Sequence, residues 1–322
     1  MGRTTEIEWT EHTWNPFAGC SVHTAGCTNC YAMRQAFRIA TFGNAPHYAG
    51  LTHKVNGNIV WTGKVARASD ATMRKALSIP GRALIFVNSM SDFWHPAADD
   101  AWRFEALAIM RRAPQHAFQV LTKRPEEAEA FFERHHGFEL PDNFWLGCTV
   151  EHAKTRHRID TIRRLPAKTR FISFEPIVGD CGSVDLSGID WMITGGESGI
   201  GHRPCRAEWV RNLHQQSMEQ GCAHFFKQWG HWSNNPLASG CPRGTRPEAW
   251  VKERDPVGKG GSLLDGQAWK EMPSCWQALE DDAEVTDLRP VFAARLPSVQ
   301  QPTVQAAGQA NQAAIEDFVL QP

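Results

Sequence analysis

Three cysteines near the N-terminus are the residues of this chain best suited to chemistry. Cys20, Cys27 and Cys30 follow a CxxxxxxCxxC pattern, and Gly19 and Gly26 stand beside two of them. Glycine permits left-handed backbone and a close approach of the chain to a bound group, so the segment can form one compact loop. Three thiolates on such a loop can hold three corners of a [4Fe–4S] cluster and leave the fourth iron open. The spacing therefore favours an iron–sulfur centre that can act on a ligand.

A structural zinc site is the alternative interpretation of the same cysteines. Zinc usually takes four ligands from two CxxC-like halves, but only one CxxC pair is present and His23 would have to complete the site. Disulfides are not expected, because the nine cysteines are odd in number and no secretory signal is seen. The other cysteines stand singly, as small buried hydrophobic residues do: Cys148, Cys181, Cys205, Cys222, Cys241 and Cys275.

Length, composition and charge narrow the class of protein. The chain has 322 residues, 42% of them hydrophobic, which is enough for one large α/β domain or two smaller ones. The net charge of −1 gives the whole protein no electrostatic preference for nucleic acid, although a local basic groove stays open. No apolar run approaches the roughly 20 residues that span a bilayer, so no membrane partner is expected. We expect a cytoplasmic protein.

Short apolar segments alternate with helical segments along most of the chain. Seven strands are expected, at about 13–17, 83–87, 117–122, 144–150, 170–174, 189–194 and 223–228. Helices are expected between them, for example over 99–112, after Pro125 and over 207–220. This alternation favours a parallel sheet, and about six to seven strands predict a complete or partial (β/α) barrel with a C-terminal extension. A doubly wound open sheet is the alternative.

Polar residues stand at or just beyond the ends of five consecutive strands. They are Asn88, Ser91, Asp92, Lys123, Arg124, Glu151, Glu175 and Glu197. The C-terminal ends of parallel strands meet at one edge of a sheet, where ligands bind in such folds, so we expect these side chains around one site. Gly195 and Gly196 precede Glu197 and let backbone amides approach a ligand closely. The alternative explanation of the same pattern is that strand ends are polar because they meet water.

The regular pattern stops near residue 232. We expect an α/β domain over 1–232 that carries the cysteine loop, an irregular strap over 233–296 packed on it, and a disordered tail over 297–322. The tail is rich in Gln, Ala, Pro and Val, and buries too little apolar surface to order itself.

The cysteine loop followed by Tyr31 resembles the cluster loop of the radical S-adenosylmethionine superfamily, whose usual spacing is CxxxCxxC. The wider pattern is more similar to the phage-associated three-Cys-motif family of unknown function, found in phages and bacteria. The resemblance runs from residue 5 to about residue 269. Its segments are TEIEWTEHTWNPFAGC, CTNCYA, NSMSDFWH, LTKRPE, GCTVE, SFEP, GGESG, FFKQWG and LLDGQAW.

This resemblance implies a barrel enzyme with a [4Fe–4S] cluster held by Cys20, Cys27 and Cys30, and with S-adenosylmethionine on the open iron. One electron from an external reductant would cleave the sulfonium to methionine and a 5′-deoxyadenosyl radical. The residues expected to bind S-adenosylmethionine are Asn88, Ser91, Asp92, Gly195, Gly196 and Glu197. The residues expected to act on the substrate are Lys123, Glu151 and Glu175. The segment LTKRPE is also similar to spore photoproduct lyase, a radical enzyme acting on DNA, which makes a nucleotide or nucleic acid a candidate substrate.

Two other functions stay open. A zinc-stabilised nucleic-acid-binding accessory protein of phages would hold stoichiometric zinc and bind DNA in a salt-dependent way. A metal-dependent nuclease would use the carboxylates at the strand ends and would survive loss of the cysteines. Its metal ligands would be Asp92, Glu151, Glu175 and Glu197.

Overall fold

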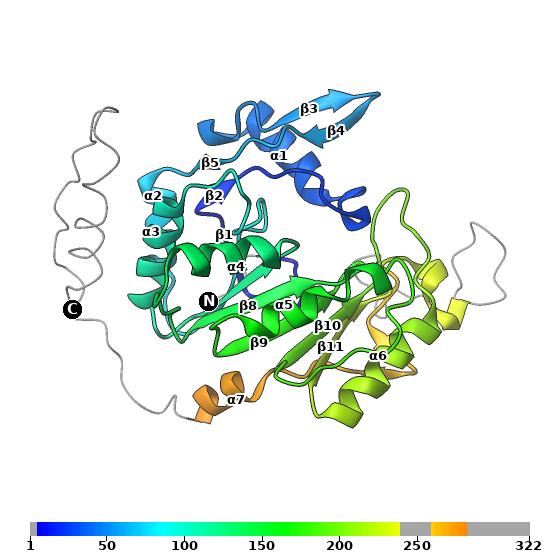
Figure 1. Cartoon of the computed structure of the whole chain (residues 1–322). Helices are drawn as coiled ribbons and strands as arrows, with labels where there is room; N and C mark the ends of the chain where they lie inside the picture. The colour runs from blue at the N-terminus through cyan, green and yellow to red at the C-terminus, as the bar shows by residue number, and fades with distance from the viewer. Residues whose placement is uncertain (1–4, 239–258, 282–322) are drawn as a thin grey trace, which may run out of the picture. The chain divides into compact units, whose positions relative to one another are not determined.

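The structure is a computed structural model that describes residues 5–238 and 259–281. Its central sheet has seven parallel strands in the order β1-β6-β7-β8-β9-β10-β11. These are β1 (His12–Trp14), β6 (Leu84–Val87), β7 (Ala117–Thr122), β8 (Phe144–Thr149), β9 (Thr169–Phe174), β10 (Trp191–Gly195) and β11 (Ala223–Gln228). Each strand lies beside the next one along the chain, so the sheet winds in one direction and curls into a half-barrel (Figure 1). The expected partial barrel is confirmed, whereas a doubly wound sheet would reverse its strand order.

Helices cover the outer face of this sheet. They are α3 (Asp100–Arg111), α4 (Pro125–Arg134), α5 (Arg158–Arg164) and α6 (Ala207–Gln220). Local sequence sets their ends: the side chain of Asp99 accepts a hydrogen bond from the Ala101 amide, and Pro125 occupies the first turn of α4. Gly221, with a φ of 67°, ends α6 in the left-handed conformation that glycine adopts at little cost.

The two faces of the sheet contribute to two separate cores. On β6, Ile85 packs into the large core shared with the helices, whereas Leu84 and Phe86 face the inner side. Tryptophans dominate the inner core, where Trp9 lies edge-on to Trp191 with ring centres 6.3 Å apart. Such aromatic pairs contribute roughly 0.5–1.5 kcal/mol beyond their buried area. The N-terminal segment therefore fills part of the concave side of the half-barrel.

The connection from β1 to β6 forms a lobe with its own core. It contains β2 (Phe17–Ala18), η1 (Ala25–Cys27), α1 (Tyr31–Phe42), η2 (Pro46–Tyr48), β3 (Thr52–Val55), β4 (Asn58–Trp61), β5 (Ala66–Arg67), α2 (Asp70–Met73) and η3 (Arg74–Ser78). Strands β3 and β4 pair as an antiparallel hairpin, and Met33, Tyr48 and Leu51 are buried in the small core beneath it. Figure 1 shows α1 and this hairpin together above the sheet.

The chain after β11 packs along the edge of the half-barrel. Its elements are η5 (Trp232–Asn234), η6 (Pro236–Ala238), β12 (Leu263–Leu264), β13 (Gln267–Ala268) and α7 (Ser274–Asp281). The Phe226 amide donates to the carbonyl of Trp269 at 2.8 Å, and the Trp191 indole donates to the carbonyl of Glu271 at 2.9 Å. The described residues up to Gln277 form one compact unit. The tail expected over 297–322 lies outside the described residues.

Within 5–238 and 259–281, the structure contains no helix with the length and apolar character needed to cross a membrane.

Candidate functional site

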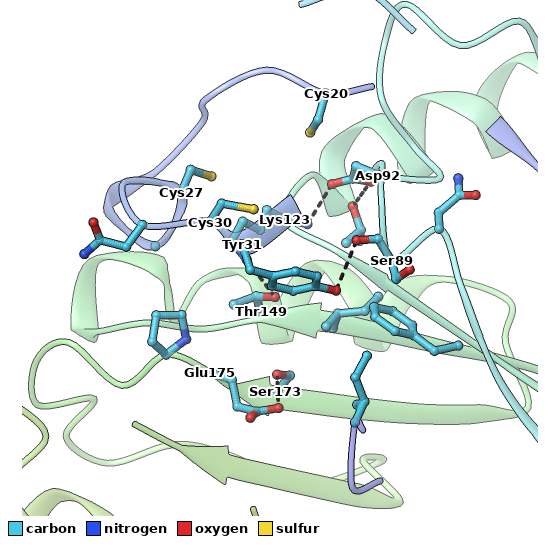
Figure 2. Close-up of a pocket in the computed structure, with 18 of the residues that line it drawn as sticks. Cys20, Cys27, Cys30, Tyr31, Ser89, Asp92, Lys123, Thr149, Ser173 and Glu175 are labelled. Carbon is cyan, nitrogen blue, oxygen red and sulfur yellow. Dashed lines mark hydrogen bonds between the residues drawn. The ribbon is translucent and has the colours of Figure 1, made fainter. Parts of the chain in front are cut away.

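A pocket of about 270 Å³ lies at the C-terminal edge of the half-barrel, where the polar strand ends meet. Cys20, Cys27 and Cys30 all line it (Figure 2). The other predicted site residues on its wall are Asn88, Ser91, Asp92, Lys123, Glu175, Gly196 and Glu197. Glu151 and Gly195 lie next to residues of the pocket, but neither of them lines its wall. Loops separated by more than a hundred residues in sequence therefore converge on one site.

The cysteine thiols are unpaired and lie in a partly desolvated environment. Cys27 is buried, Cys20 and Cys30 are half-buried, and all three are free of disulfides. Burial raises the pKa of Cys20 to about 12, and the charges of Asp92 and Cys30 act in the same direction while Arg124 opposes them. Burial is also the main cause of the raised pKa of Cys30. The thiols of Cys20 and Cys30 therefore stay protonated at neutral pH unless a bound cation takes the place of the protons.

The three thiols share one wall of the pocket. In Figure 2 they occupy one side of the pocket, and Ser173 and Glu175 occupy the other. Among the residues that the structure describes, no three His, Cys, Asp or Glu side chains are grouped as ligands of one metal ion. A cluster holds its thiolates on separate corners and so needs a wider arrangement than one zinc ion does. The loop brings three free thiols to one pocket wall, which is the number of protein ligands that such a cluster takes.

Three polar contacts fix the cysteine loop to the ends of the strands, and the first runs through Arg124. Its guanidinium lies 3.1 Å from a carboxylate oxygen of Asp92 and donates to the carbonyl and hydroxyl of Ser21 at 3.1 and 2.9 Å. The same guanidinium approaches the Sγ of Cys20 at 3.7 Å. Both charged side chains are buried, and Asp92 also accepts from the hydroxyl of Thr122 at 2.7 Å. The beginning of the loop is therefore bound to β6 and β7.

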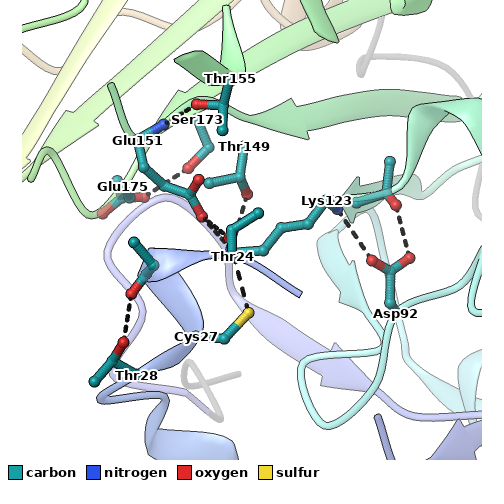
Figure 3. Close-up of polar contacts among 12 residues, drawn as sticks. Thr24, Cys27, Thr28, Asp92, Lys123, Thr149, Glu151, Thr155, Ser173 and Glu175 are labelled. Atoms are coloured by element: carbon teal, nitrogen blue, oxygen red, sulfur yellow. Dashed lines mark hydrogen bonds and ion pairs between the residues drawn. The ribbon is translucent and has the colours of Figure 1, made fainter. Parts of the chain in front are cut away.

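Glu151 provides the second contact, from the end of β8. One oxygen of this fully buried carboxylate accepts a hydrogen bond of 2.6 Å from the hydroxyl of Thr24 (Figure 3). The other oxygen lies 3.5 Å from the guanidinium of Arg158, and the ammonium of Lys123 lies 3.9 Å from the oxygen that Thr24 contacts. A Cβ atom at Gly26 would lie only 2.3 Å from Glu151, so only glycine lets the loop pass this close. Glu151 thus supports the loop from below.

Glu197 provides the third contact, from the loop after β10. It accepts hydrogen bonds from the Asn29 amide at 3.2 Å and from the backbone and side chain of Arg203 at 2.9 and 2.8 Å. Burial raises the pKa of Glu197, but the hydrogen bonds from Arg203 and Asn29 outweigh it and hold the pKa below its usual range. Arg203 also donates to the carbonyl of Ala25 at 2.9 Å. The part of the loop between Cys27 and Cys30 is held in this way.

Glu175 and Lys227 form an ion pair inside the pocket, with 2.9 Å between their charged atoms. Glu175 also accepts from the indole of Trp9 at 3.1 Å and the hydroxyl of Ser173 at 3.4 Å. The pair spans from β9 to β11 across β10. A Cβ atom at Gly195 would lie 2.8 Å from Glu175, so glycine at this position leaves the path open. Gly195 therefore leaves room for Glu175, and its predicted contact with a cofactor stays a prediction.

Several pocket residues were not identified from the sequence. Lys227, Gln228 and Trp61 line the pocket, as does Trp9, which lies about eleven residues before the first cysteine. Lys227 and Phe225 are two residues apart on β11. Side chains at this spacing lie on the same face of a strand, so the sequence could have placed Lys227 on the inner face with Phe225. The position of Trp61 depends on the β3–β4 hairpin, which the sequence analysis did not predict.

Fold and site together define the class: a parallel α/β half-barrel with a pocket that is lined by a three-cysteine loop at the C-terminal edge. The chain belongs to the family described as protein of unknown function DUF5131, which matches residues 4–273. This range includes the cysteine loop and every predicted site residue. No curated protein and no solved structure matches the chain.

Proposed function

We propose that the protein is a radical S-adenosylmethionine enzyme of the phage-associated three-Cys-motif type, with a [4Fe–4S] cluster on Cys20, Cys27 and Cys30. The observation that carries this proposal is that the three thiols of one loop line one pocket at the ligand-binding edge of a parallel half-barrel. Cys20, Cys27 and Cys30 would hold the cluster, and the reduced cluster would supply the electron for cleavage of S-adenosylmethionine to methionine and a 5′-deoxyadenosyl radical.

The carboxylates at the strand ends have different tasks in this proposal. Asp92, Glu151 and Glu197 hold the cysteine loop through Arg124, Thr24 and Asn29, so they position the cluster ligands. Second contacts of this kind orient metal ligands and set the properties of the metal centre. These residues therefore act through the loop, and the free pocket wall is left to other groups.

Lys123, Glu175 and Asn88 are the groups left to contact the bound molecules. The ammonium of Lys123 lies 3.3 Å from the hydroxyl of Thr149 at the pocket wall. Glu175, paired with Lys227, offers a carboxylate held in place by the Trp9 indole. Positive and negative groups on the wall of one pocket suit a ligand with both charges, as the methionyl part of S-adenosylmethionine has.

The geometry favours this proposal over a zinc protein or a nuclease. The thiols and His23 are not grouped as ligands of one ion in the described residues. Each carboxylate that a nuclease would need already faces a cation of the protein: Arg124, Arg158, Lys227 and Arg203 neutralise Asp92, Glu151, Glu175 and Glu197, respectively. Asp92, Glu151 and Glu197 also hold the cysteine loop, and carboxylates engaged in both ways are poor ligands for a catalytic cation.

Iron and sulfide analysis after anaerobic reconstitution tests the proposal. We expect about four irons and four sulfides per chain for the native protein, and a large loss in Cys27→Ala. The control is Cys275→Ala, because Cys275 is exposed and lies outside the pocket wall. Stoichiometric zinc with no bound iron, or equal iron contents in the two variants, would contradict the proposal.

A further inference from the structure

The lobe next to the pocket has a charge very different from that of the whole chain. Between Glu11 and Asp70 the sequence contains no acidic residue. The same stretch contains five basic residues, although the net charge of the protein is only −1: Arg34, Arg38, Lys54, Lys64 and Arg67. We call residues 31–67, which include α1 and the β3–β4 hairpin, the basic lobe. Its charge is a local feature that the whole-chain value conceals.

The cations of the basic lobe are available to a partner. Arg34, Arg38, Lys54 and Lys64 are exposed. None of these four forms an ion pair with another residue of the described ranges, whereas Arg67 is paired with Glu105. Arg34 and Arg38 are four residues apart on α1 and so share one face of that helix. Unpaired cations on a rigid helix and hairpin form a surface complementary to a polyanion.

The basic lobe adjoins the pocket directly. The Gly63 amide donates to the carbonyl of Cys20 at 3.1 Å, and the next residue is the exposed Lys64. Trp61, at the end of β4, and Tyr31, at the start of α1, both line the pocket. A chain-like anion bound along the lobe would therefore pass the pocket mouth.

Inside the pocket, one carboxamide lacks any partner. Asn88 is 2% exposed, and neither its Oδ1 nor its Nδ2 has a hydrogen-bond partner in the described residues. Its backbone is left-handed, with a φ of 59°, a conformation that asparagine adopts more readily than most residues. The Oε1 of the buried Gln228 on the opposite side of the sheet also has no partner there. Buried polar groups of this kind are usually satisfied, so both amides await a ligand with donor and acceptor atoms.

The pocket floor beside Asn88 is aromatic. Phe86, two residues earlier on β6, also lines the pocket, and Trp9 packs against it with ring centres 4.8 Å apart. A flat heteroaromatic ring could stack here and present its edge to a carboxamide, which pairs with adjacent donor and acceptor atoms of a base. An acidic peptide would match the charges of the basic lobe but would not supply such an edge.

We propose that the substrate class of this pocket is a single nucleic-acid strand. The basic lobe binds its phosphates, and one base enters the pocket, where Asn88 contacts the base edge. Enzymes that act on a base inside a strand commonly take that base out of its stack in this way. The chemistry performed on the base rests on the proposed function above, whereas the binding does not depend on the cluster.

Fluorescence anisotropy of the full chain with labelled strands of about 16 nucleotides tests this inference, with DNA and RNA in separate arms. We expect Arg34→Glu/Arg38→Glu to weaken binding about tenfold or more and to reduce its salt dependence, because phosphate contacts release counterions. The control is Arg112→Glu/Lys168→Glu, which makes the same charge change. These residues precede the N-terminal ends of β7 and β9, at the edge of the sheet opposite to the pocket.

Asn88→Gly separates base contact from charge. Glycine tolerates the left-handed backbone at this position and removes only the carboxamide. We expect about a tenfold loss of affinity with an unchanged salt dependence. The inference would be overturned if both variants bound the strands with the affinity of the native protein, or if an acidic peptide of equal charge bound as tightly as the strands.

Strand binding and cluster content are measured separately, so that this inference and the proposed function can fail independently. We expect Cys27→Ala to lose the cluster and still bind the strands. Retained strand binding without any cluster in the native protein would contradict the enzyme proposal alone. A cluster that assembles in native protein without measurable strand binding would contradict only the nucleic-acid inference.

Discussion

The carboxylate of Glu151 accepts a hydrogen bond of 2.6 Å from the hydroxyl of Thr24, 127 residues earlier in the chain. This contact joins the end of β8 to the cysteine loop beneath Cys27. We expect Thr24→Val to lower the free energy of unfolding by about 1–2 kcal/mol, because the buried carboxylate loses one donor while Arg158 stays. Urea unfolding measures this change. Iron content after reconstitution should fall in the same variant, whereas the exposed Thr28→Val should retain it; equal iron contents would show that the contact does not position the ligands.

The close approach of Gly26 to Glu151 gives a second prediction. A methyl group at this position would lie 2.3 Å from the carboxylate, so Gly26→Ala must displace the loop. We expect a loss of most bound iron and a fall in unfolding free energy of about 1–3 kcal/mol. Gly57→Ala is the control, because nothing lies within 4 Å of its Cβ. Any loss of stability in this variant comes from the φ of 79° and not from a clash. If Gly26→Ala assembles as much cluster as Gly57→Ala, the loop is not constrained here.

The Glu175–Lys227 pair depends on the absence of a side chain at residue 195. A Cβ atom there would lie 2.8 Å from Glu175, and we expect Gly195→Ala to cost about 1–3 kcal/mol of stability. The same substitution in a Glu175→Ala background should cost less, because the clash is gone. A double-mutant cycle from urea unfolding gives this coupling. Additive effects would mean that the two residues do not meet.

Buried histidines give the protein a predictable dependence on pH. His224 has no exposed surface, and burial, followed by the charges of His214 and Lys270, lowers its pKa to about 3. The unfolded chain binds this proton below about pH 6.5 and the folded chain does not, so stability falls as the pH drops from about 6.5 towards 3. The slope contributed by one such group is roughly 1.4 kcal/mol per pH unit. Burial also lowers the pKa of His95 and His116 to about 4, which adds to the effect.

Substitution of His224 isolates its share of this pH dependence. His224→Gln keeps a polar group near the hydroxyl of Thr194, which lies 2.7 Å from the histidine ring. We expect the slope of unfolding free energy between pH 6 and 4 to fall by up to the contribution of one proton, measured by urea unfolding at several pH values. An unchanged slope would show that His224 takes up its proton in the folded state.

The sheet could be predicted because its strands are buried on both faces. Runs such as Leu84–Val87 are apolar throughout, as strands of a covered parallel sheet must be, and helices with clear caps separate them. The alternation predicted a parallel sheet, but it left the strand order open between a barrel and a doubly wound sheet. Trp9, Trp145, Trp191 and Trp276 fill the concave side, and the sequence did not show that they would gather there.

The β3–β4 hairpin was missed because its strands are short and mostly exposed. Asn56 and Gly57, both with positive φ, form its turn, and this dipeptide is a hairpin signal that the sequence contained. The partners of the strand-end carboxylates could not be predicted at all. Position at a strand end predicts that Glu151 lies near the site, but only the tertiary fold shows that Thr24 and Arg158 contact its carboxylate.

Electron paramagnetic resonance of the anaerobically reconstituted, dithionite-reduced protein tests the central proposal most directly. We expect the signal of a [4Fe–4S]⁺ cluster, and we expect added S-adenosylmethionine to change it, because three cysteine ligands leave one iron open to the cofactor. The spectrum of Cys275→Ala should match that of the native protein, and Cys27→Ala should lose the signal. The absence of a cluster signal in native protein, or a signal that S-adenosylmethionine leaves unchanged, would contradict the account.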